Sequence, residues 1–209
     1  MGFVKSCKAT KPILGNKNWI GCFFWKDGGG RKMENYKKII EEASEKNSSI
    51  VIYNSDKNHA KLLVSKMIEK AQEEIKLYTS GCDILFYNES ENIKNSLANK
   101  NKLKIQIIFD DNVNKDKFKE IFPKAEFYCK KKDISDFQLK FSDSTELIDD
   151  DYKIIKHFMV IDNKMFRIES PHEPKAEVVN ALGCFNNANI SNKLSNTFEV
   201  IKKEYSIEC

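Results

Sequence analysis

The sequence contains little proline and glycine and has no long apolar run. Its 209 residues include only 4 prolines and 8 glycines, and segments with apolar periodicity continue throughout, so the composition is not that of a disordered chain. No segment approaches the ~20 apolar residues that a membrane-spanning helix needs, and the start lacks the apolar stretch of a secretory signal. We therefore expect no membrane span.

The cysteines show no Cys-x-x-Cys pair and no compact framework. There are 6, dispersed at positions 7, 22, 82, 129, 184 and 209. This dispersed spacing is not typical of a disulfide scaffold or of structural zinc, so the sequence predicts reduced thiols and a cytoplasmic protein. A glycine-rich phosphate loop, a Gly-x-Ser-x-Gly elbow and a Cys-His pairing motif are also missing, and we expect no cofactor.

The charge balance excludes little. The 35 basic and 31 acidic residues leave a net charge of +4, which is too small to imply nucleic acid by itself. A chain of this length with 41% apolar residues can bury one substantial core. We expect one main domain over residues 33–209.

Residues 1–32 stand apart as an arm. The apolar run 19–25 is followed by three consecutive glycines at 28–30, which predict a flexible joint. The run is interpreted either as an edge strand or lid over the core, or as an exposed aromatic patch for a partner.

Helical and strand periodicities alternate through the first two thirds of the main domain. Helices are predicted at 34–46, from about 58 to 75, at 89–100 and at 114–122, and strands at 49–53, 76–79, 103–109 and 125–129. This alternation predicts an α/β fold with a mixed, largely parallel sheet flanked by helices.

The last third changes character. Strands are predicted at 137–142, 154–161 and 164–168, and a final helix at 190–204. Asp162 and Asn163 separate the second and third of these strands, and Asn tolerates a positive φ. We expect a tight hairpin there.

The segment 154–164 reads Ile-Ile-Lys-His-Phe-Met-Val-Ile-Asp-Asn-Lys. It resembles the signature hairpin of the phospholipase D superfamily, in which His-x-Lys, four residues and Asp-Gly lie on a strand and its turn. The resemblance covers about residues 49–205 and implies a single phospholipase D-like α/β domain. In that family the imidazole attacks phosphorus, the lysine holds phosphoryl oxygens and the aspartate orients the site.

The family's His-Lys pair is broken here. Anchored on Asp162, the alignment places Ile155 at the position of the nucleophilic His and His157 at that of the Lys. Anchored on His157 as nucleophile, it places Met159 at the position of the Lys, and Asp162 arrives two residues early. Without the pair, ordinary family catalysis is not expected.

The first alignment is preferred, because it also places Ser170 on the serine of the family's Gly-Ser-x-Asn motif. Glu169 then replaces the Gly and His172 the Asn. A polar cluster remains on the hairpin and the loop after it, made up of Lys156, His157, Asp162, Arg167, Glu169, Ser170 and His172.

Three interpretations of this cluster stay open. Arg167 and Glu169, two residues apart, are either a surface salt bridge beside a half-buried histidine, or Arg167 and His157 form a remodelled pocket for a phosphate, carboxylate or nucleotide. The third is a metal site made of His157, His172, Asp162 and Glu169, whose spacing matches no recognised motif.

Three functions follow. The first is a catalytically degenerate module that binds an anion or a partner and regulates it. The second is a divergent phosphodiesterase or nuclease that uses His157 and Asp162, with Arg167 or Lys156 as the cation. The third is an assembly component that docks through residues 1–32. The resemblance further implies a homodimer; other candidate partners are a protein, a nucleic acid or a phosphorylated ligand.

Overall fold

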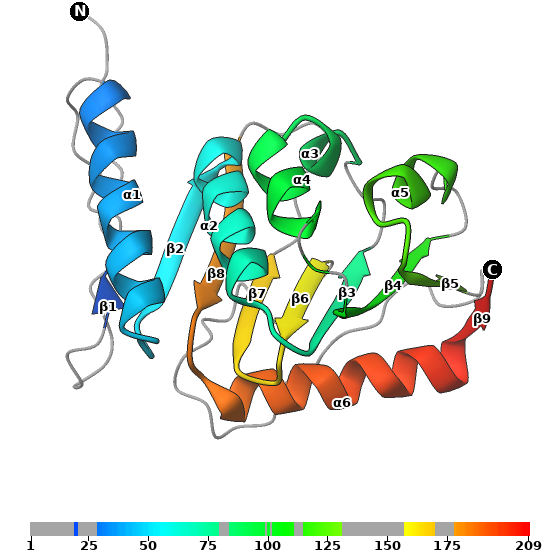
Figure 1. The fold of residues 1–209 in the computed structure, drawn as a ribbon. Coiled ribbons are helices and arrows are strands. Elements are labelled where there is room, and N and C mark those ends of the chain that lie inside the picture. Colours follow the sequence, from blue (N-terminus) through cyan, green and yellow to red (C-terminus); the bar gives the residue numbers. More distant parts are fainter. Residues whose placement is uncertain are drawn as a thin grey trace, which may run out of the picture.

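The computed structural model describes residues 19–20, 29–79, 84–98, 100, 102–110, 115–130, 157–169 and 178–209. Helices and strands alternate over most of this part of the chain (Figure 1). The elements are β1 (Trp19–Ile20), α1 (Gly29–Glu45), β2 (Val51–Asp56), α2 (Lys57–Lys70), β3 (Glu74–Thr79), α3 (Ile84–Asn88), α4 (Glu91–Ala98), β4 (Lys104–Asp110), α5 (Lys115–Ile121), β5 (Glu126–Lys130), β6 (His157–Ile161), β7 (Met165–Glu169), β8 (Val178–Cys184), α6 (Ala188–Tyr205) and β9 (Ser206–Glu208).

The strands of the described residues form one mixed sheet in the order β1-β2-β8-β7-β6-β3-β4-β5-β9. The strands that alternate with helices, β3, β4 and β5, are parallel, as is the pair of β1 and β2. The later strands β6, β7 and β8 pair antiparallel with their neighbours. The β6–β7 hairpin therefore lies at the centre of the sheet, and the predicted α/β architecture with a mixed sheet is confirmed. The sheet is not largely parallel, because five of the eight pairings among the described strands are antiparallel.

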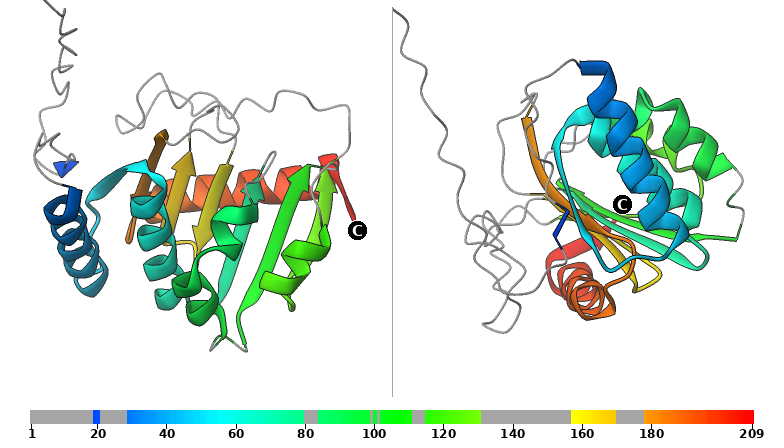
Figure 2. Two further views of the ribbon diagram at one scale, coloured as in Figure 1. Left: turned by 90° about the horizontal axis from the view of Figure 1, so that it is seen from above. Right: turned by 90° about the vertical axis from the view of Figure 1, so that its left-hand side faces the viewer.

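Helices cover both faces of the sheet. Figure 2 shows α6 on the opposite side of the sheet from α2, α4 and α5. Because side chains alternate along a strand, Leu77 and Met159 belong to the core under α1–α5, whereas Tyr78 and Phe158 belong to the core under α6. Two apolar layers thus bury the hairpin on both faces.

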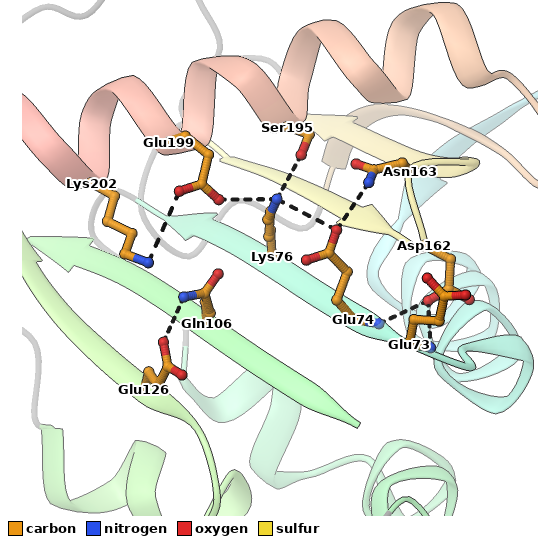
Figure 3. A network of polar contacts seen from close by, with 10 residues as sticks. All are labelled: Glu73, Glu74, Lys76, Gln106, Glu126, Asp162, Asn163, Ser195, Glu199 and Lys202. Atoms are coloured by element: carbon orange, nitrogen blue, oxygen red, sulfur yellow. Dashed lines mark hydrogen bonds and ion pairs between the residues drawn. The ribbon is translucent and has the colours of Figure 1, made fainter. Parts of the chain in front are cut away.

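The turn of the central hairpin forms as its residues predict. Asp162 and Asn163 have φ values of 53° and 51°, in the left-handed region that Asp and Asn tolerate in tight turns. The turn spans the three residues between Ile161 and Met165, which are direct partners. The Asp162 carboxylate accepts hydrogen bonds from the backbone N–H groups of Gln72, Glu73 and Glu74 at 2.8, 2.8 and 2.9 Å. These bonds tie the turn to the start of β3 (Figure 3).

Some element boundaries differ from the sequence predictions. Asp56 is the N-cap of α2, and its carboxylate accepts from the backbone N–H of His59. The helix ends at Lys70, so Ile75 belongs to β3 rather than to the helical stripe. The second and third glycines of the triplet, which was predicted as a flexible joint, are the first two residues of α1, since this helix begins at Gly29. The predicted strand 137–142 lies outside the described residues.

The sequence patterns did not predict α3, β8 and β9. The most important of these is β8, because it joins β2 to β7 in the sheet. Its sequence, Val-Val-Asn-Ala-Leu-Gly-Cys, carries a glycine, which sequence patterns associate with a break in a strand. The packing of α2 explains the glycine, since a Cβ at Gly183 would lie 2.7 Å from Leu63 Cδ2.

The prediction that the thiols are reduced is wrong for two cysteines. Cys129 in β5 and Cys209, which follows β9, form a disulfide with a Cα–Cα distance of 5.9 Å. The partners are 80 residues apart in sequence, and only the pairing of β5 with the unpredicted β9 brings them together. Cys184 is buried and free, while Cys7, Cys22 and Cys82 lie outside the described residues.

Two further expectations concern the arm and the membrane. The strand β1 pairs parallel with β2 at one edge of the sheet, which agrees with the edge-strand interpretation for Trp19–Ile20. None of the helices in the described ranges is both long and apolar enough to cross a bilayer.

Candidate anion-binding site

Two of the polar side chains predicted to cluster, His157 and Glu169, lie at one rim of the sheet. His157 is the first residue of β6 and Glu169 the last of β7, and the two are direct partners in the antiparallel ladder. The same row continues to Thr79 on β3 and, through Ala181 on β8, to Asn54 on β2. Directly opposed residues project from the same face, so this row faces the α1–α5 layer.

Arg167 and Glu169 form the ion pair that their spacing predicts. The distance between Arg167 Nη1 and Glu169 Oε2 is 2.6 Å. The pair is buried, with side-chain exposures of 7% and 11%, and in this respect the prediction of a surface salt bridge is wrong. The reason is the position of β7, which lies between two other strands and under the helical layer.

The Arg167 guanidinium is further held by an aromatic ring. Its Cζ lies 5.9 Å from the centroid of Phe86 in α3, a distance at which a cation is attracted to the face of a ring. Arg167 Nε is buried and has no hydrogen-bond partner among the described residues. A donor of this kind costs free energy unless something accepts from it.

His157 is half-buried at the rim rather than packed inside the core. Its Nδ1 lies 2.8 Å from the Thr79 hydroxyl, and Thr79 itself is buried. Either the hydroxyl donates to an unprotonated Nδ1 or a protonated Nδ1 donates to the hydroxyl. In both cases the contact fixes the orientation of the imidazole.

Asn54 is a member of the row that sequence reasoning missed. From the sequence its place shortly before the helix makes it an N-cap candidate for α2, a role that Asp56 fills. Its side chain is 1% exposed, and within the described part of the chain neither its Oδ1 nor its Nδ2 has a hydrogen-bond partner. In the sequence its signal is its place directly after the apolar run predicted as the strand 49–53.

Asp162 does not join His157. It follows the last residue of β6, whereas His157 is the first, and a strand of 5 residues separates them by roughly 16 Å at ~3.3 Å per residue. The Asp162 carboxylate is occupied by the backbone of residues 72–74. Lys156, Ser170 and His172 lie outside the described residues.

The metal interpretation gains no support from the described residues, which contain no group of three or more His, Cys, Asp or Glu side chains placed to hold a metal ion. The prediction involved His172, which is outside them.

A second polar cluster lies on the α6 face, where Lys76 is buried in β3 (Figure 3). Lys76 Nζ donates to Ser195 Oγ at 2.7 Å and forms ion pairs with Glu199 and Glu74 at 3.0 and 3.4 Å. Two of these partners belong to α6. The cluster therefore fixes α6 on the sheet with its charges paired.

Next to Lys76 on this face, Gln106 and Tyr128 both donate to Glu126 Oε2, at 2.5 and 2.9 Å. Burial, together with the bond to Glu126, raises the pKa of Tyr128 to about 12. For Glu126, burial acts to raise the pKa, but the bonds from Gln106 and Tyr128 and the charges of Lys104 and Lys202 together outweigh it, and the pKa is lowered. These side chains lie on the opposite face of the sheet from the row that contains His157.

Comparison with known proteins gives a likeness of fold. No protein-family model matches the chain, and no curated protein sequence is significantly similar to it. Among solved structures, NucT from Helicobacter pylori has a TM-score of 0.52 and 16% identity, over 76% of this chain and 98% of NucT.

Two other structures are more distant. TrmBL2, an archaeal chromatin protein, has a TM-score of 0.47 and 13% identity over 86% of this chain and 62% of its own. Phosphatidylserine synthase from Haemophilus influenzae has a TM-score of 0.47 and 9% identity over 77% and 39%. The likeness to NucT is one of fold, and the central hairpin in a helix-flanked mixed sheet is the fold that the resemblance to the phospholipase D superfamily implies.

Proposed function

We propose that this chain is a phospholipase D-like domain that has lost the family's ordinary catalysis and binds a phosphate or another anion as a regulatory module. The observation that carries the proposal is Arg167, a buried guanidinium near the rim whose Nε has no partner among the described residues. Guanidinium groups bind phosphate and carboxylate oxygens through a planar fork of donors. His157, one row away on the same face, adds a second donor.

Loss of ordinary catalysis follows from the residues beside His157. Alternate residues of β6 share a face, and the one after His157 on its face is Met159, which is 3% exposed. A thioether cannot neutralise a phosphoryl oxygen as a lysine does. Ile155, which takes the position of the nucleophile in the other alignment, has no reactive group.

The proposal is tested with bis(p-nitrophenyl) phosphate as the probe, by calorimetry for binding and by absorbance for released nitrophenolate. We expect binding without turnover, and about tenfold weaker binding in Arg167→Lys, which keeps the charge beside Glu169 but removes the fork. Lys94→Gln is the matched control, because it removes an exposed cation of α4. Unchanged affinity in Arg167→Lys would refute the proposal.

A second candidate, a divergent phosphodiesterase or nuclease, is favoured by one specific relationship. Arg167 lies directly opposite Met159 in the β6–β7 ladder, so it stands beside the position that a His-x-Lys lysine would occupy if His157 were the nucleophile. Thr79 holds the imidazole through Nδ1, which would leave attack to Nε2. Turnover of the same probe that disappears in His157→Ala would establish this candidate in place of the first.

The expected partners are part of the proposal. The homodimer implied by the resemblance is tested by light scattering of the purified chain, where a monomer mass at micromolar concentration would exclude it. Docking through residues 1–32 is tested by deleting them and measuring complex formation. A nucleic acid would bind through its phosphates. This is tested by measuring whether a single-stranded oligonucleotide competes with the probe for binding.

A further inference from the structure

We infer that the disulfide between Cys129 and Cys209 controls an interface with a second copy of this chain. While the bond is intact, β9 covers the edge of β5 (Figure 1). When the bond is reduced, β9 leaves this edge, and β5 pairs antiparallel with β5 of the second copy. The inference goes beyond the proposed function and does not depend on it, because β3 and β4 lie between β5 and the β6–β7 hairpin.

The strand β9 is held on the edge of β5 by few contacts. It has 3 residues, of which Ser206 is buried while Ile207 is 57% exposed and Glu208 is exposed. Beyond the strand, the backbone N–H of Cys209 donates to the carbonyl of Phe127 at 3.1 Å. Fixing a short segment costs conformational entropy that a few backbone hydrogen bonds barely offset. The disulfide is therefore what keeps β9 in place.

Reduction removes the covalent link. Cys129 and Cys209 are both partly exposed, so a dithiol reductant can reach the bond between them. One thiolate of the reductant attacks a sulfur of this bond, and its second thiol then resolves the mixed disulfide. Two electrons pass to the chain, which gains two thiols with protons from the reductant, and the reductant is left as its own disulfide. Residues 206–209 are then free to leave β5.

An uncovered β5 presents unpaired backbone groups. The carbonyl of Phe127 faces the edge, since it accepts from Cys209 while β9 is in place. The direction of the backbone groups alternates along a strand, so the N–H and C=O groups of Cys129 face the same way. An open edge of this kind is a template for pairing with another strand, and a very short strand such as β9 protects it.

The sequence of β5, Glu-Phe-Tyr-Cys-Lys, is complementary to itself in an antiparallel pairing centred on Tyr128. In that register Glu126 of each copy lies opposite Lys130 of the other. The outward-facing backbone groups of Phe127 and Cys129 become hydrogen-bonded partners, and their apolar side chains are directly opposed. Opposite charges and apolar groups in such positions stabilise a sheet. A second copy of this chain therefore fits the edge.

The first test is the mass of the chain in solution, measured by light scattering with and without dithiothreitol. Protein concentrations up to about 200 μM are used, because an interface this small is expected to be weak. We expect the mass to at least double on reduction. The variant with Cys129→Ser and Cys209→Ser should have the larger mass in both conditions. Equal masses of the oxidised and reduced wild-type chain would overturn the inference.

The decisive test reverses charges at the two ends of β5. In the proposed pairing Lys130→Glu places carboxylates opposite each other, and Glu126→Lys does the same with ammonium groups, so neither variant should gain mass on reduction. An equal mixture of the two variants restores opposite charges and should regain the larger mass. Lys38→Glu is the matched control, because it reverses an exposed charge of α1 at the other end of the sheet (Figure 1) and should associate like the wild-type chain.

Other modes of association give other results. If β9 of the second copy replaced the chain's own β9, Lys130 would face Ser206, and Lys130→Glu would associate like the wild-type chain. That result, or a mixture that does not regain the larger mass, would overturn the inference. If circular dichroism shows that Glu126→Lys is unfolded, Lys130→Glu decides against Lys38→Glu. Binding of bis(p-nitrophenyl) phosphate to the oxidised chain tests the proposed function separately.

Discussion

The carboxylate of Asp162 accepts a hydrogen bond from the backbone N–H of Glu73 at 2.8 Å, although 89 residues separate the two in sequence. The neighbouring N–H groups of residues 72 and 74 donate to the same carboxylate. The side chain that follows the central strand thus joins the β6–β7 hairpin to β3, at the end of the sheet opposite to His157.

Replacement of Asp162 is therefore expected to act on stability. Asp162→Ala removes three charge-assisted hydrogen bonds, each worth about 1.5–3 kcal/mol when buried and less where solvent replaces them, as it does at Gln72 and Glu73. We expect a loss of about 2 kcal/mol in the free energy of unfolding, measured by urea denaturation. Asp162→Asn, which keeps the turn and one acceptor, should lose less. A loss below about 0.5 kcal/mol in Asp162→Ala would show that the bonds are unimportant.

A second prediction concerns the contact between β8 and α2. In Gly183→Ala the new Cβ would meet Leu63 Cδ2 at 2.7 Å, and Leu63 is fully buried, so we expect a loss of about 1–3 kcal/mol from overpacking. Leu63→Ala, made in the Gly183→Ala background, should cost about 1 kcal/mol less than in the wild-type chain. Strictly additive losses in thermal or urea unfolding would contradict the proposed clash.

A third prediction concerns the bond between Cys129 and Cys209. It closes a loop of 80 residues. In the chain-entropy model, removing a cross-link that closes a loop of this size lowers the free energy of unfolding of the protein by about 4 kcal/mol. Reduction with dithiothreitol should lower the free energy of unfolding by an amount of this order. A variant with Cys129→Ser and Cys209→Ser should be insensitive to the reductant. Equal stability of the oxidised and reduced wild-type chain would contradict the prediction.

Much of the fold was predictable because it depends on local patterns. The apolar stripe of α2 and the turn at Asp162–Asn163 are written in consecutive residues, and the structure confirms both. The strand β8 was not predictable, because the glycine that Leu63 requires interrupts its pattern. The disulfide was missed for a related reason, since it depends on the pairing of β5 with a strand of 3 residues.

In the candidate site too, one contact could be predicted from local sequence and the other neighbours could not. The pairing of Arg167 with Glu169 follows from a spacing of two residues in one strand, so the sequence predicts it. Asn54 and Thr79 reach the same row only because β8 lies next to β2 and β3 next to β6. Those neighbours are far apart in sequence, and their register is set by packing on both faces, which no single segment encodes.

The last prediction concerns alkaline pH and Tyr128. Burial and the hydrogen bond to Glu126 raise the pKa of Tyr128 from 10.0 to about 12 in the folded chain. The folded state therefore retains the phenolic proton longer than the unfolded state does, and the resulting stabilisation is complete below pH 10 and is lost between pH 10 and about 12. In this range the free energy of unfolding should fall more steeply with pH in the wild-type chain than in Tyr128→Phe.

The measurement is urea unfolding at several pH values, combined with the tyrosinate absorbance of the two chains. Below pH 11 the folded wild-type chain and Tyr128→Phe should show nearly the same tyrosinate signal, because Tyr128 is still protonated. In concentrated urea the signal of the wild-type chain should exceed that of the variant from about pH 10, where an exposed tyrosine titrates. An excess with a midpoint near pH 10 in the folded chains would mean that the bond between Tyr128 and Glu126 does not hold the proton, and the polar cluster beneath α6 would then be open to water.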